Sequence, residues 1–269
     1  MAMHLLSDKE YTEIDSKIQT ALKPLATMLK EVPIRRVPEF VESVKSYSFK
    51  LNSKSRKGSK SSVPSNSDFQ MDEVNVNLDS FDTPSIRLSR SMIEASRKSG
   101  IGVQSAVDIS MAYSLIEFEN QYVIGKLKET KNTDTWNWTG ELHEKLNEVS
   151  STLNKIVANK VPMTKPTLAI NPLDIANLNF NQFMKSGMAV IRDDLKVKVI
   201  PCSEVDSGTA ILYENNALVL DFPVAMSAKL HKVNPPTTPC DWEEFFLKDK
   251  LGGRIKYDGG IYKINITTS

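Results

Sequence analysis

The residue types that most often carry catalysis are few in this sequence and poorly spaced for it. The three histidines, His4, His143 and His231, form no metal-ligand pattern with another His, Cys, Asp or Glu. No serine lies in a Gly-x-Ser-x-Gly turn, and neither Cys202 nor Cys240 is flanked by a nucleophile signature. We therefore expect no catalytic site, no bound metal and no cofactor, and we predict that the protein is not an enzyme.

Two further patterns have a structural explanation. Gly100-Ile101-Gly102 lacks the third glycine of a dinucleotide-binding loop and follows no convincing strand, which favours a plain turn between helices. The acidic pairs Asp193-Asp194 and Glu243-Glu244 are typical of solvated turns. Neither pattern predicts a reaction.

Basic residues gather in one polar stretch that carries no acidic or aromatic residue between Lys50 and Ser67. These residues are Lys50, Lys54, Arg56, Lys57 and Lys60. Lysines and arginines release counterions from phosphates, so the stretch could bind nucleic acid. A solvated loop tip is the simpler interpretation and is favoured here.

Trp136 and Trp138 lie in a predicted loop, residues 131–140. Two aromatic rings so close together could form a stacking platform, for a flavin for example. Tryptophans in such a position also serve as anchors at protein–protein contacts. The sequence leaves both interpretations open.

Composition limits the classes of function. The chain has 269 residues, is 40% hydrophobic and carries a formal net charge of +1, which allows one large domain or two joined ones. A nucleic-acid-binding surface would normally show a clear basic excess. The two cysteines are expected to be reduced thiols, although a disulfide between them stays open. We find no apolar run of about 18 residues and no secretory signal, so we expect a soluble, cytoplasmic protein.

The elements that would position any site begin with an amphipathic helix. Ser7 and Glu10 form a capping box, and Pro24 is expected to bend the helix before it ends near Val32. Its apolar stripe is Tyr11, Ile14, Ile18, Leu22, Leu25 and Leu29.

Residues 46–84 form the most unusual segment, which we call the arm. Its two ends, 46–51 and 73–78, are strand-like, and the residues between them offer almost nothing apolar to bury. Such long loops are uncommon in compact domains. A polar two-stranded arm is marginally stable alone, so it must either move in solvent or pack on a partner.

The remainder of the chain changes from helices to strands. Long helices are predicted at 104–128, which we call the spine helix, and at 140–160. A helix starting at Pro172 is expected to run toward Phe183. Predicted strands are 167–170, 197–200, 209–213, 217–220 and 226–230, followed by a hairpin of 254–257 and 261–266. This order predicts an α+β fold.

Five segments together resemble a known family. They are Leu6-Ser7-Asp8-Lys9-Glu10-Tyr11-Thr12-Glu13-Ile14-Asp15, Ile34-Arg35-Arg36-Val37-Pro38-Glu39, Ile86 to Ser96, Phe118 to Gly125, and Thr167 to Pro172. In order and spacing the chain is similar to shell proteins of encapsulin nanocompartments and to tailed-phage major capsid proteins, which share the Hong Kong 97-type fold. It departs from the encapsulin pattern at Tyr11, where tryptophan is common, at Pro24 and throughout Cys240–Ser269.

The resemblance implies an N-terminal helix and N-terminal arm at 1–45, which is distinct from the arm defined above. Residues 46–84, the arm defined above, would be an extended loop, and 85–164 would be a peripheral domain with the spine helix. It further implies an apical domain at 165–235 and a return to the peripheral domain at 236–269. The extended loop would pack on a neighbouring subunit through Phe49, Leu51, Val74 and Val76. A lumenal groove for a cargo peptide would be lined by Ile14, Ile18, Leu22 and Leu25, although a stripe facing the helix's own core explains these four equally directly.

The function that follows is a self-assembling icosahedral shell subunit, with 60 or more copies of itself in a closed particle. An encapsulin-type shell would enclose a cargo protein such as a ferritin-like or peroxidase enzyme in the cytoplasm. The alternative is a viral or proviral capsid protein that encloses nucleic acid in a virion. A small-molecule-binding or enzymatic α+β domain remains as a third class.

Overall fold

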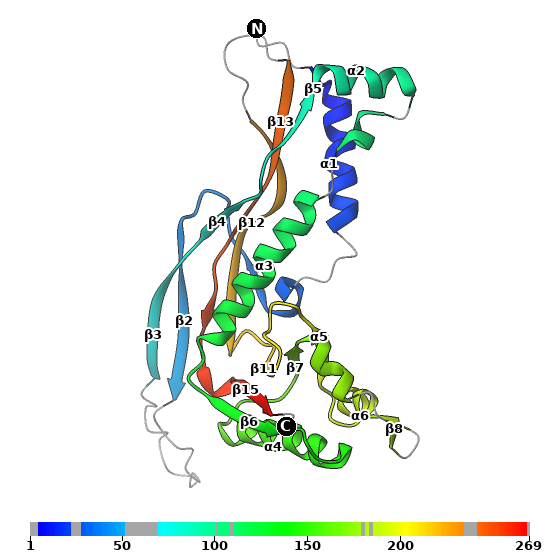
Figure 1. Cartoon of the computed structure of the whole chain (residues 1–269). Coiled ribbons are helices and arrows are strands. Elements are labelled where there is room, and N and C mark those ends of the chain that lie inside the picture. The colour runs from blue at the N-terminus through cyan, green and yellow to red at the C-terminus, as the bar shows by residue number, and fades with distance from the viewer. Residues whose placement is uncertain are drawn as a thin grey trace.

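The protein is elongated, with a compact end built on one sheet and a longer part built on another (Figure 1). The computed structural model describes residues 5–22, 28–51, 69–100, 102–107, 110–178, 181–182, 185–233 and 241–267. Helices and strands alternate irregularly along the chain, which confirms the predicted α+β class.

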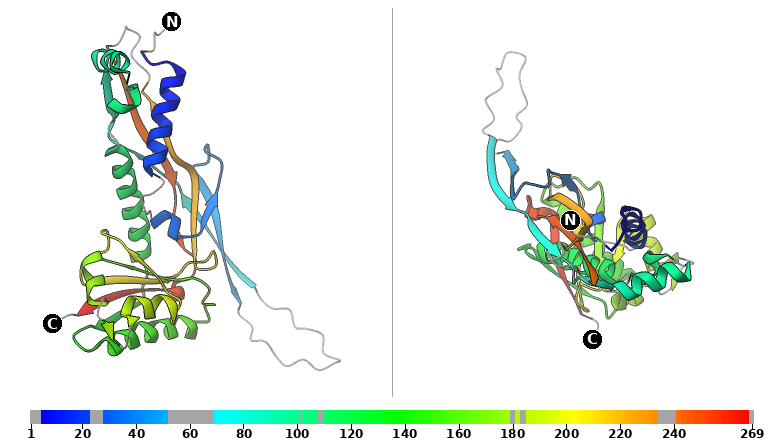
Figure 2. Two further views of the ribbon diagram at one scale, coloured as in Figure 1. Left: turned by 90° about the vertical axis from the view of Figure 1, so that its right-hand side faces the viewer. Right: turned by 90° about the horizontal axis from the view of Figure 1, so that it is seen from above.

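The first sheet forms the long part. Its strand order is β1-β12-β13-β4, and β14 pairs with β12 while β5 pairs with β13. The antiparallel strands β12 and β13 run along most of its length beside helix α3 (Figures 1 and 2). The strands are β1 (Ile34–Arg36), β4 (Asp79–Asp82), β5 (Ile86–Ser89), β12 (Leu220–Lys232), β13 (Trp242–Leu251) and β14 (Arg254–Ile255).

The second sheet forms the compact end, in the order β10-β7-β11-β15-β6. Its inner strand β7, between β10 and β11, is buried along its whole length. The strands are β6 (Thr133–Asn137), β7 (Pro166–Ile170), β10 (Lys198–Pro201), β11 (Thr209–Glu214) and β15 (Ile261–Thr267), and the helices of this end are α4 (Leu142–Ala158), α5 (Pro172–Ile175) and α6 (Gly187–Asp193). Two short paired strands, β8 (Asn181–Gln182) and β9 (Lys185–Ser186), lie before α6.

Pro172 begins α5 as predicted, with Asn171 as the N-cap whose side chain accepts from the Leu173 amide at 2.9 Å. The helix does not run toward Phe183. It ends at Ile175 and is followed by one 3-10 turn.

The predicted strands of the arm are present as an antiparallel hairpin of β2 (Ser43–Leu51) and β3 (Phe69–Asn77). The hairpin projects from the long part of the subunit (Figure 2). The residues between the strands lie outside the described part of the chain.

Helix α1 (Asp8–Leu22) begins with the predicted capping box. The Ser7 amide donates to Glu10 Oε2 at 2.9 Å, and the Glu10 amide donates to Ser7 Oγ at 3.3 Å. The prediction that the helix reaches Val32 was wrong in its last turn, because Met28–Glu31 form a separate 3-10 helix. α1 is described as far as Leu22, and Pro24, the predicted site of the bend, lies outside the described residues.

The spine helix is α3 (Ser110–Lys128), which starts six residues later than predicted; residues 103–106 form a 3-10 turn. Phe118, predicted on the buried face, is 41% exposed. Glu119 occupies the buried face in its place. An apolar periodicity could not identify a buried carboxyl group.

Helix α2 (Arg90–Ser99) begins at the N-cap Ser89, after a strand, and not at the 82–85 turn that the sequence indicated. Gly100 ends α2 with a left-handed φ of 69°, and Gly102 follows with a φ of 85°. The Gly-x-Gly pattern is therefore a turn between helical segments, as predicted.

The C-terminal third differs most from the prediction. The segments 217–220 and 226–230 were predicted as two strands, but residues 220–232 form the single strand β12. The predicted hairpin of 254–257 and 261–266 does not form: β14 pairs with β12 and β15 pairs with β11, in different sheets. β13, which the sequence did not predict, contains Glu243 and Glu244, both buried and not in a solvated turn.

Strand pairing divides the chain between the two sheets differently from the predicted domain ranges. β6 and α4, from the range 85–164, lie at the compact end with β7 and β11, from the range 165–235. β15, from the range 236–269, joins the same sheet. The domain names themselves remain predictions.

Candidate assembly surfaces

The β2–β3 hairpin carries the four residues predicted to contact a neighbour. Val74 is 44% exposed on β3, whereas Val76, nearer the base of the hairpin, is only 6% exposed. The side chains of Phe49 and Leu51 on β2 lie outside the described part. Met71, opposite Phe49, is 54% exposed and was missed by the sequence analysis. An apolar side chain available to a partner is thus present on β3, and the role of the hairpin residues in assembly stays a prediction.

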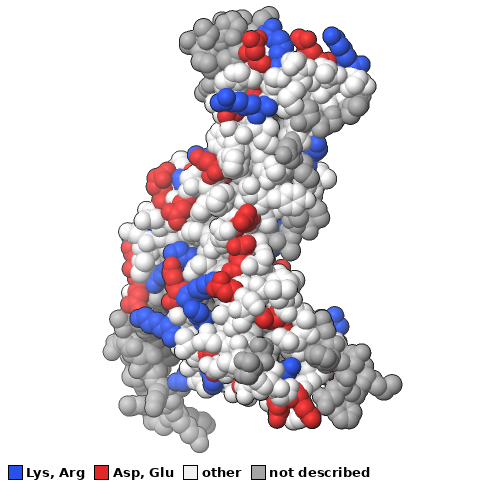
Figure 3. All heavy atoms as spheres, viewed as in Figure 1, with Lys and Arg blue, Asp and Glu red and all other residues white. Residues whose placement is uncertain are grey.

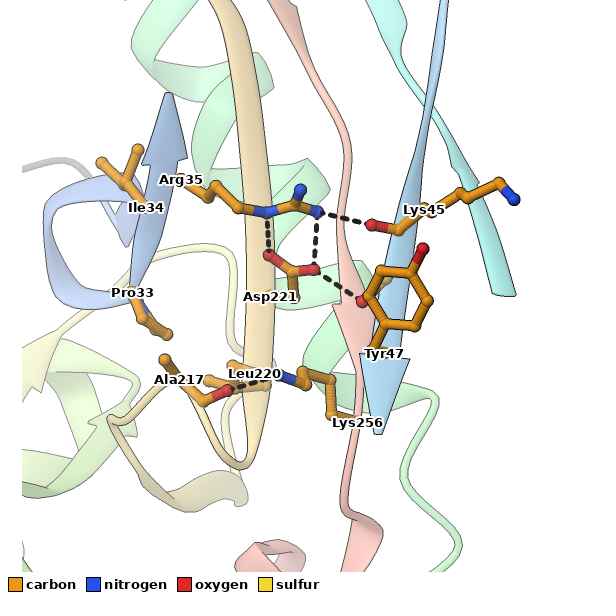
Figure 4. A pocket seen from close by; sticks show the side chains of 10 residues that line it. Pro33, Ile34, Arg35, Lys45, Tyr47, Ala217, Leu220, Asp221 and Lys256 are labelled. Atoms are coloured by element: carbon orange, nitrogen blue, oxygen red, sulfur yellow. Dashed lines mark hydrogen bonds and ion pairs between the residues drawn. The ribbon is translucent and has the colours of Figure 1, made fainter. Parts of the chain in front are cut away.

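The base of the hairpin is fixed to the first sheet by a buried carboxylate (Figure 4). Asp221 on β12 accepts hydrogen bonds from Arg35 Nε at 3.1 Å, Arg35 Nη2 at 2.8 Å and Ser46 Oγ at 2.6 Å. Arg254 on β14 donates to the Ser46 carbonyl at 2.6 Å and to Ser48 Oγ at 3.3 Å. Two arginines and one aspartate therefore orient β2 relative to β12 and β14.

The charge on Asp221 is stabilised despite its burial. Burial raises the pKa of this carboxyl group. Hydrogen bonds from Arg35 and Ser46 and the positive charge of Arg35 together lower the pKa by more than burial raises it, so the net pKa lies below the usual value. The ion pair therefore persists at any pH near neutrality.

A pocket of about 350 Å³ opens between β1, β2 and β12 at this base (Figure 4). Its basic side chains already have partners: Lys256 Nζ donates to the Ala217 carbonyl at 2.9 Å, and Lys45 Nζ lies 2.7 Å from Glu73 Oε1. Its lining residues are Pro33, Ile34, Arg35, Lys45, Ser46, Tyr47, Ala217, Leu220, Asp221 and Lys256. The Ser46 hydroxyl and the Asp221 carboxylate in this lining are hydrogen-bonded to each other, and Asp221 is also ion-paired with Arg35, so these groups position the hairpin.

The predicted cargo-groove residues lie on the inward side of α1. Ile14 and Ile18 are fully buried in an apolar cluster with Leu88, Phe245 and other residues of this same chain. Leu22 is partly buried against that cluster, and Leu25 lies outside the described residues. Of the four, Leu22 retains some exposed surface, and a groove for a peptide remains a prediction.

The N-terminal segment is held in place from two sides. Glu243 Oε1 on β13 accepts from the Leu5 amide at 2.6 Å, and Arg97 on α2 donates to the Leu5 carbonyl at 2.8 Å. Arg97 also contacts both carboxylate oxygens of Glu10 at 2.7 Å. This hydrogen bonding, opposed by burial and helped by Ser7, lowers the pKa of Glu10 to about 2. α1 is therefore anchored to α2 and β13.

Trp136 and Trp138 form no exposed platform in the subunit. Residues 133–137 are strand β6 and not the predicted loop. The two rings stack with centroids 5.6 Å apart, and Trp136 is fully buried while Trp138 is 3% exposed. Trp136 Nε1 donates to Thr152 Oγ1 at 2.9 Å, which joins β6 to α4. Both tryptophans are part of the core of the compact end. They expose almost no surface to a neighbouring subunit in this arrangement, and their role as contact residues stays a prediction.

The basic run of the arm falls outside the described residues, except for the backbone of Lys50. On the face shown in Figure 3, acidic and basic side chains are interspersed and form no single basic region. The charge distribution of that face therefore does not itself favour binding to nucleic acid.

The residues considered for chemistry are dispersed. His143 is on the surface as predicted, with its side chain 61% exposed, and His231 stacks on Phe246. Cys202 is buried, and burial raises the pKa of its thiol; Cys240 and His4 lie outside the described residues. Within the described part of the chain, no cluster of three or more His, Cys, Asp or Glu could hold a metal ion. None of the helices described there is long and apolar enough to cross a membrane.

The network at the hairpin base was not found from the sequence. One signal was available: Asp221 is a single carboxylate within the apolar stretch Val219-Leu220-Asp221-Phe222. A charged residue in such a stretch requires a partner. The partner itself, Arg35, is 186 positions away, which no local pattern reveals.

Comparison with known proteins gives a consistent result for the fold. The sequence matches no family model and no curated protein. The structure is similar to that of a virus-like particle from Pyrococcus furiosus, with a TM-score of 0.69 and 18% identity over 95% of this chain and 99% of that one.

Phage capsid proteins are also similar. The capsid of cyanophage P-SCSP1u gives a TM-score of 0.60 at 12% identity, over 91% of this chain and 89% of that one. The capsid of Myoviridae phage XM1 gives 0.61 at 7% identity, over 90% and 92%. Each of these similarities covers about nine-tenths of both chains.

Proposed function

We propose that this chain, which has the Hong Kong 97-type fold of these capsid and virus-like-particle proteins, is the subunit of a closed icosahedral shell. The observation that carries the proposal is coverage. The similarity includes 95% of this chain and 99% of the virus-like-particle chain, so it spans nearly the full length of both.

The shape of the subunit supports the same function. The β2–β3 hairpin projects from the long part (Figure 2), so much of its surface is available to another molecule. An isolated two-stranded hairpin is marginally stable in water. The contacts of Arg35, Asp221 and Arg254 fix its direction at the base, and a fixed projecting hairpin suits a subunit that must pack on a neighbour in one geometry.

Within this class we propose an encapsulin-type nanocompartment that encloses a cargo protein. The support is the N-terminal resemblance and the anchoring of α1, which is clamped by Glu243 and Arg97 over the apolar cluster of this chain. A helix so fixed could offer the same surface in every copy of the shell. Such a particle would lie in the cytoplasm.

A viral capsid protein is the second candidate, and a specific observation favours it. The phage capsids give TM-scores of 0.60 and 0.61 over about nine-tenths of this chain. Under this alternative the particle would enclose nucleic acid and would be part of a virion.

The test is the size and content of the particle formed by the full chain. Size-exclusion chromatography and electron microscopy should reveal a closed particle of megadalton mass, and a monodisperse species near the 30.1 kDa of one chain at high concentration would refute the shell. The particle purified from its native host would then be opened. Co-purified protein supports the nanocompartment, and nuclease-protected nucleic acid supports the viral capsid.

A further inference from the structure

Two carboxyl groups are buried against each other where the spine helix α3 meets β13. Glu119 on α3 is 8% exposed and Asp249 on β13 is fully buried. The two carboxyl groups lie close enough for each to shift the pKa of the other, at the contact between α3 and β13. Two ionised carboxylates could form no hydrogen bond with each other there, because neither has a hydrogen to donate.

The hydrogen bonds of Asp249 indicate which group holds the proton. Oδ1 of Asp249 accepts from the Lys250 amide at 2.7 Å. Oδ2 is buried and, among the described residues, receives no hydrogen bond from an N–H or from another residue's hydroxyl. A buried carboxylate oxygen left without a donor is costly. A protonated Glu119 supplies the missing donor.

The electrostatic surroundings agree with this assignment. Burial raises the pKa of Glu119 to about 8, the charge of Asp249 adds to the effect, and Lys30 opposes it. Burial also raises the pKa of Asp249, while hydrogen bonds from Glu119 and Lys250 and the charge of Arg36 oppose it. Glu119 is therefore the group that keeps its proton at neutral pH.

The other charged groups on the elements packed against the pair are engaged elsewhere. Lys17 donates to backbone carbonyls, Arg254 holds β2, and the remaining ones form ion pairs or other contacts. They are Asp79 with Tyr122, Asp82 with Lys248, Asp221 with Arg35, Lys229 with Glu39, Lys232 with Glu243, and His231 against Phe246. Asp15 on α1 is partly buried, and its Oδ1 has no hydrogen-bond partner among the described residues. Arg36 is hydrogen-bonded to Ser227.

We propose that Glu119 and Asp249 share one proton across the contact between α3 and β13, and that loss of this proton above neutral pH loosens the contact. The pair is then a pH-sensitive latch between the spine helix and the first sheet. When Glu119 ionises, two negative charges lie together in a site with low polarity, and the hydrogen bond between them is lost. The seam between helix and sheet is where the repulsion acts.

The sign of the pH dependence follows from proton binding. Glu119 holds its proton up to about pH 8 in the folded protein and to about 4.5 when unfolded. Between these values the folded state binds more protons, so its stability falls as pH rises. The folding equilibrium constant should decrease by up to about tenfold per pH unit in this window and then level off.

The test compares the full-length protein with Glu119→Gln between pH 6 and 9.5. The glutamine amide can donate to Asp249 at every pH, so the variant should lose the decrease in melting temperature that the wild type shows from pH 6 to about 8, and it should be more stable than the wild type at pH 9. Hydrogen exchange, corrected for its intrinsic pH dependence, should accelerate in α3 and β13 of the wild type alone. Glu117→Gln, at an exposed position on the same helix, is the matched control and should behave as the wild type.

Infrared spectroscopy keeps the proposal testable if Glu119→Gln fails to fold. The wild type at pH 7 should show the C=O stretch of a protonated carboxylic acid, and this band should disappear by pH 9.5. A wild-type spectrum without the band at pH 7 would overturn the proposal. A folded Glu119→Gln variant whose melting temperature still falls as much as that of the wild type between pH 6 and about 8 would also overturn the proposal.

One consequence rests on the proposed function: in an assembled shell, the latch would make the particle expand or soften reversibly as pH rises. Light scattering of wild-type and Glu119→Gln particles at pH 7 and 9.5 measures this. A protein that forms no particle at any pH refutes the shell, while the infrared band and the melting curves still decide the latch.

Discussion

Replacing Asp221 with alanine should release the base of the β2–β3 hairpin while leaving the compact end folded. The change removes an ion pair with Arg35, whose side chain is 42% exposed, and such a pair is worth about 1 kcal/mol. It also leaves the buried hydroxyl of Ser46 without its acceptor, which costs about 1–3 kcal/mol. The expected loss is about 2–4 kcal/mol, or roughly 4–12 °C in melting temperature for a chain of this size.

Hydrogen exchange followed by mass spectrometry locates the effect. β2 and β3 should exchange faster in Asp221→Ala, whereas β7 and β11 in the second sheet should keep their protection. If the hairpin packs on a neighbour, particle yield should fall more than the yield of folded chain. Lys45→Ala is the control, because it removes an exposed ion pair with Glu73 within the hairpin and should change the stability little.

Two results would refute this account of the hairpin base. One is a stability loss for Asp221→Ala no larger than that of Lys45→Ala. The other is faster exchange spread evenly over both sheets, which would mean that Asp221 supports the whole fold and not the direction of the hairpin.

Two further substitutions test other contacts. Glu10→Gln should cost about 1 kcal/mol of stability at pH 7 and nothing near pH 2, because the folded pKa of about 2 lies below the unfolded value of 4.5. This contribution to stability is present above pH 4.5 and is lost as pH falls toward 2. Melting curves at both pH values measure the effect, and an equal loss at both would contradict the expectation. Gly252→Ala should destabilise the protein by about 1–3 kcal/mol, because its Cβ would lie 2.7 Å from the Asn77 carbonyl oxygen and 2.9 Å from the Val76 side chain. Gly125→Ala is the control: its Cβ would meet nothing within 4 Å, so this change should be neutral or stabilising. Equal urea midpoints for the two variants would contradict this expectation.

Elements with local signals could be predicted from the sequence. The capping box of α1, the long helix α4, the strand β7 and the glycine that ends α2 each depend on residues a few positions apart. The hairpin strands were also found, because their alternation ends at a long polar segment. The overall arrangement was reached through the order of segments, which the structural similarity confirms as a capsid-type fold.

β12 was predicted as two separate strands, but it continues through Pro223. Proline removes one donor but not the acceptor, and the Pro223 carbonyl still accepts from the Gly252 amide at 2.8 Å. The strand continues because its neighbours tolerate the missing hydrogen.

The candidate site was less predictable because its contacts are distant in sequence. The tryptophans were placed in a contact loop because an exposed and a buried aromatic residue look the same in a sequence. Thr152, which accepts the hydrogen bond of the Trp136 indole, is on the following helix. The groove residues Ile14 and Ile18 meet Phe245, more than 200 positions away.

The charged residues of β13 made this strand hard to predict, and one of them takes part in the contact that we propose to respond to pH. Charged residues in the stretch Trp242-Glu-Glu-Phe-Phe-Leu-Lys-Asp-Lys-Leu251 conceal the period of a strand, yet several are buried. Each holds a different element.

Glu243 binds the N-terminal backbone, Glu244 binds Arg87 on β5 at 3.1 Å, and Lys250 binds Glu42 before β2 at 2.6 Å. In these three contacts a carboxylate meets a cation or an N–H group.

Asp249 differs, because its partner Glu119 is a second acid. Of these four contacts along one strand, the one to the spine helix therefore depends on a proton that mildly alkaline solution can remove.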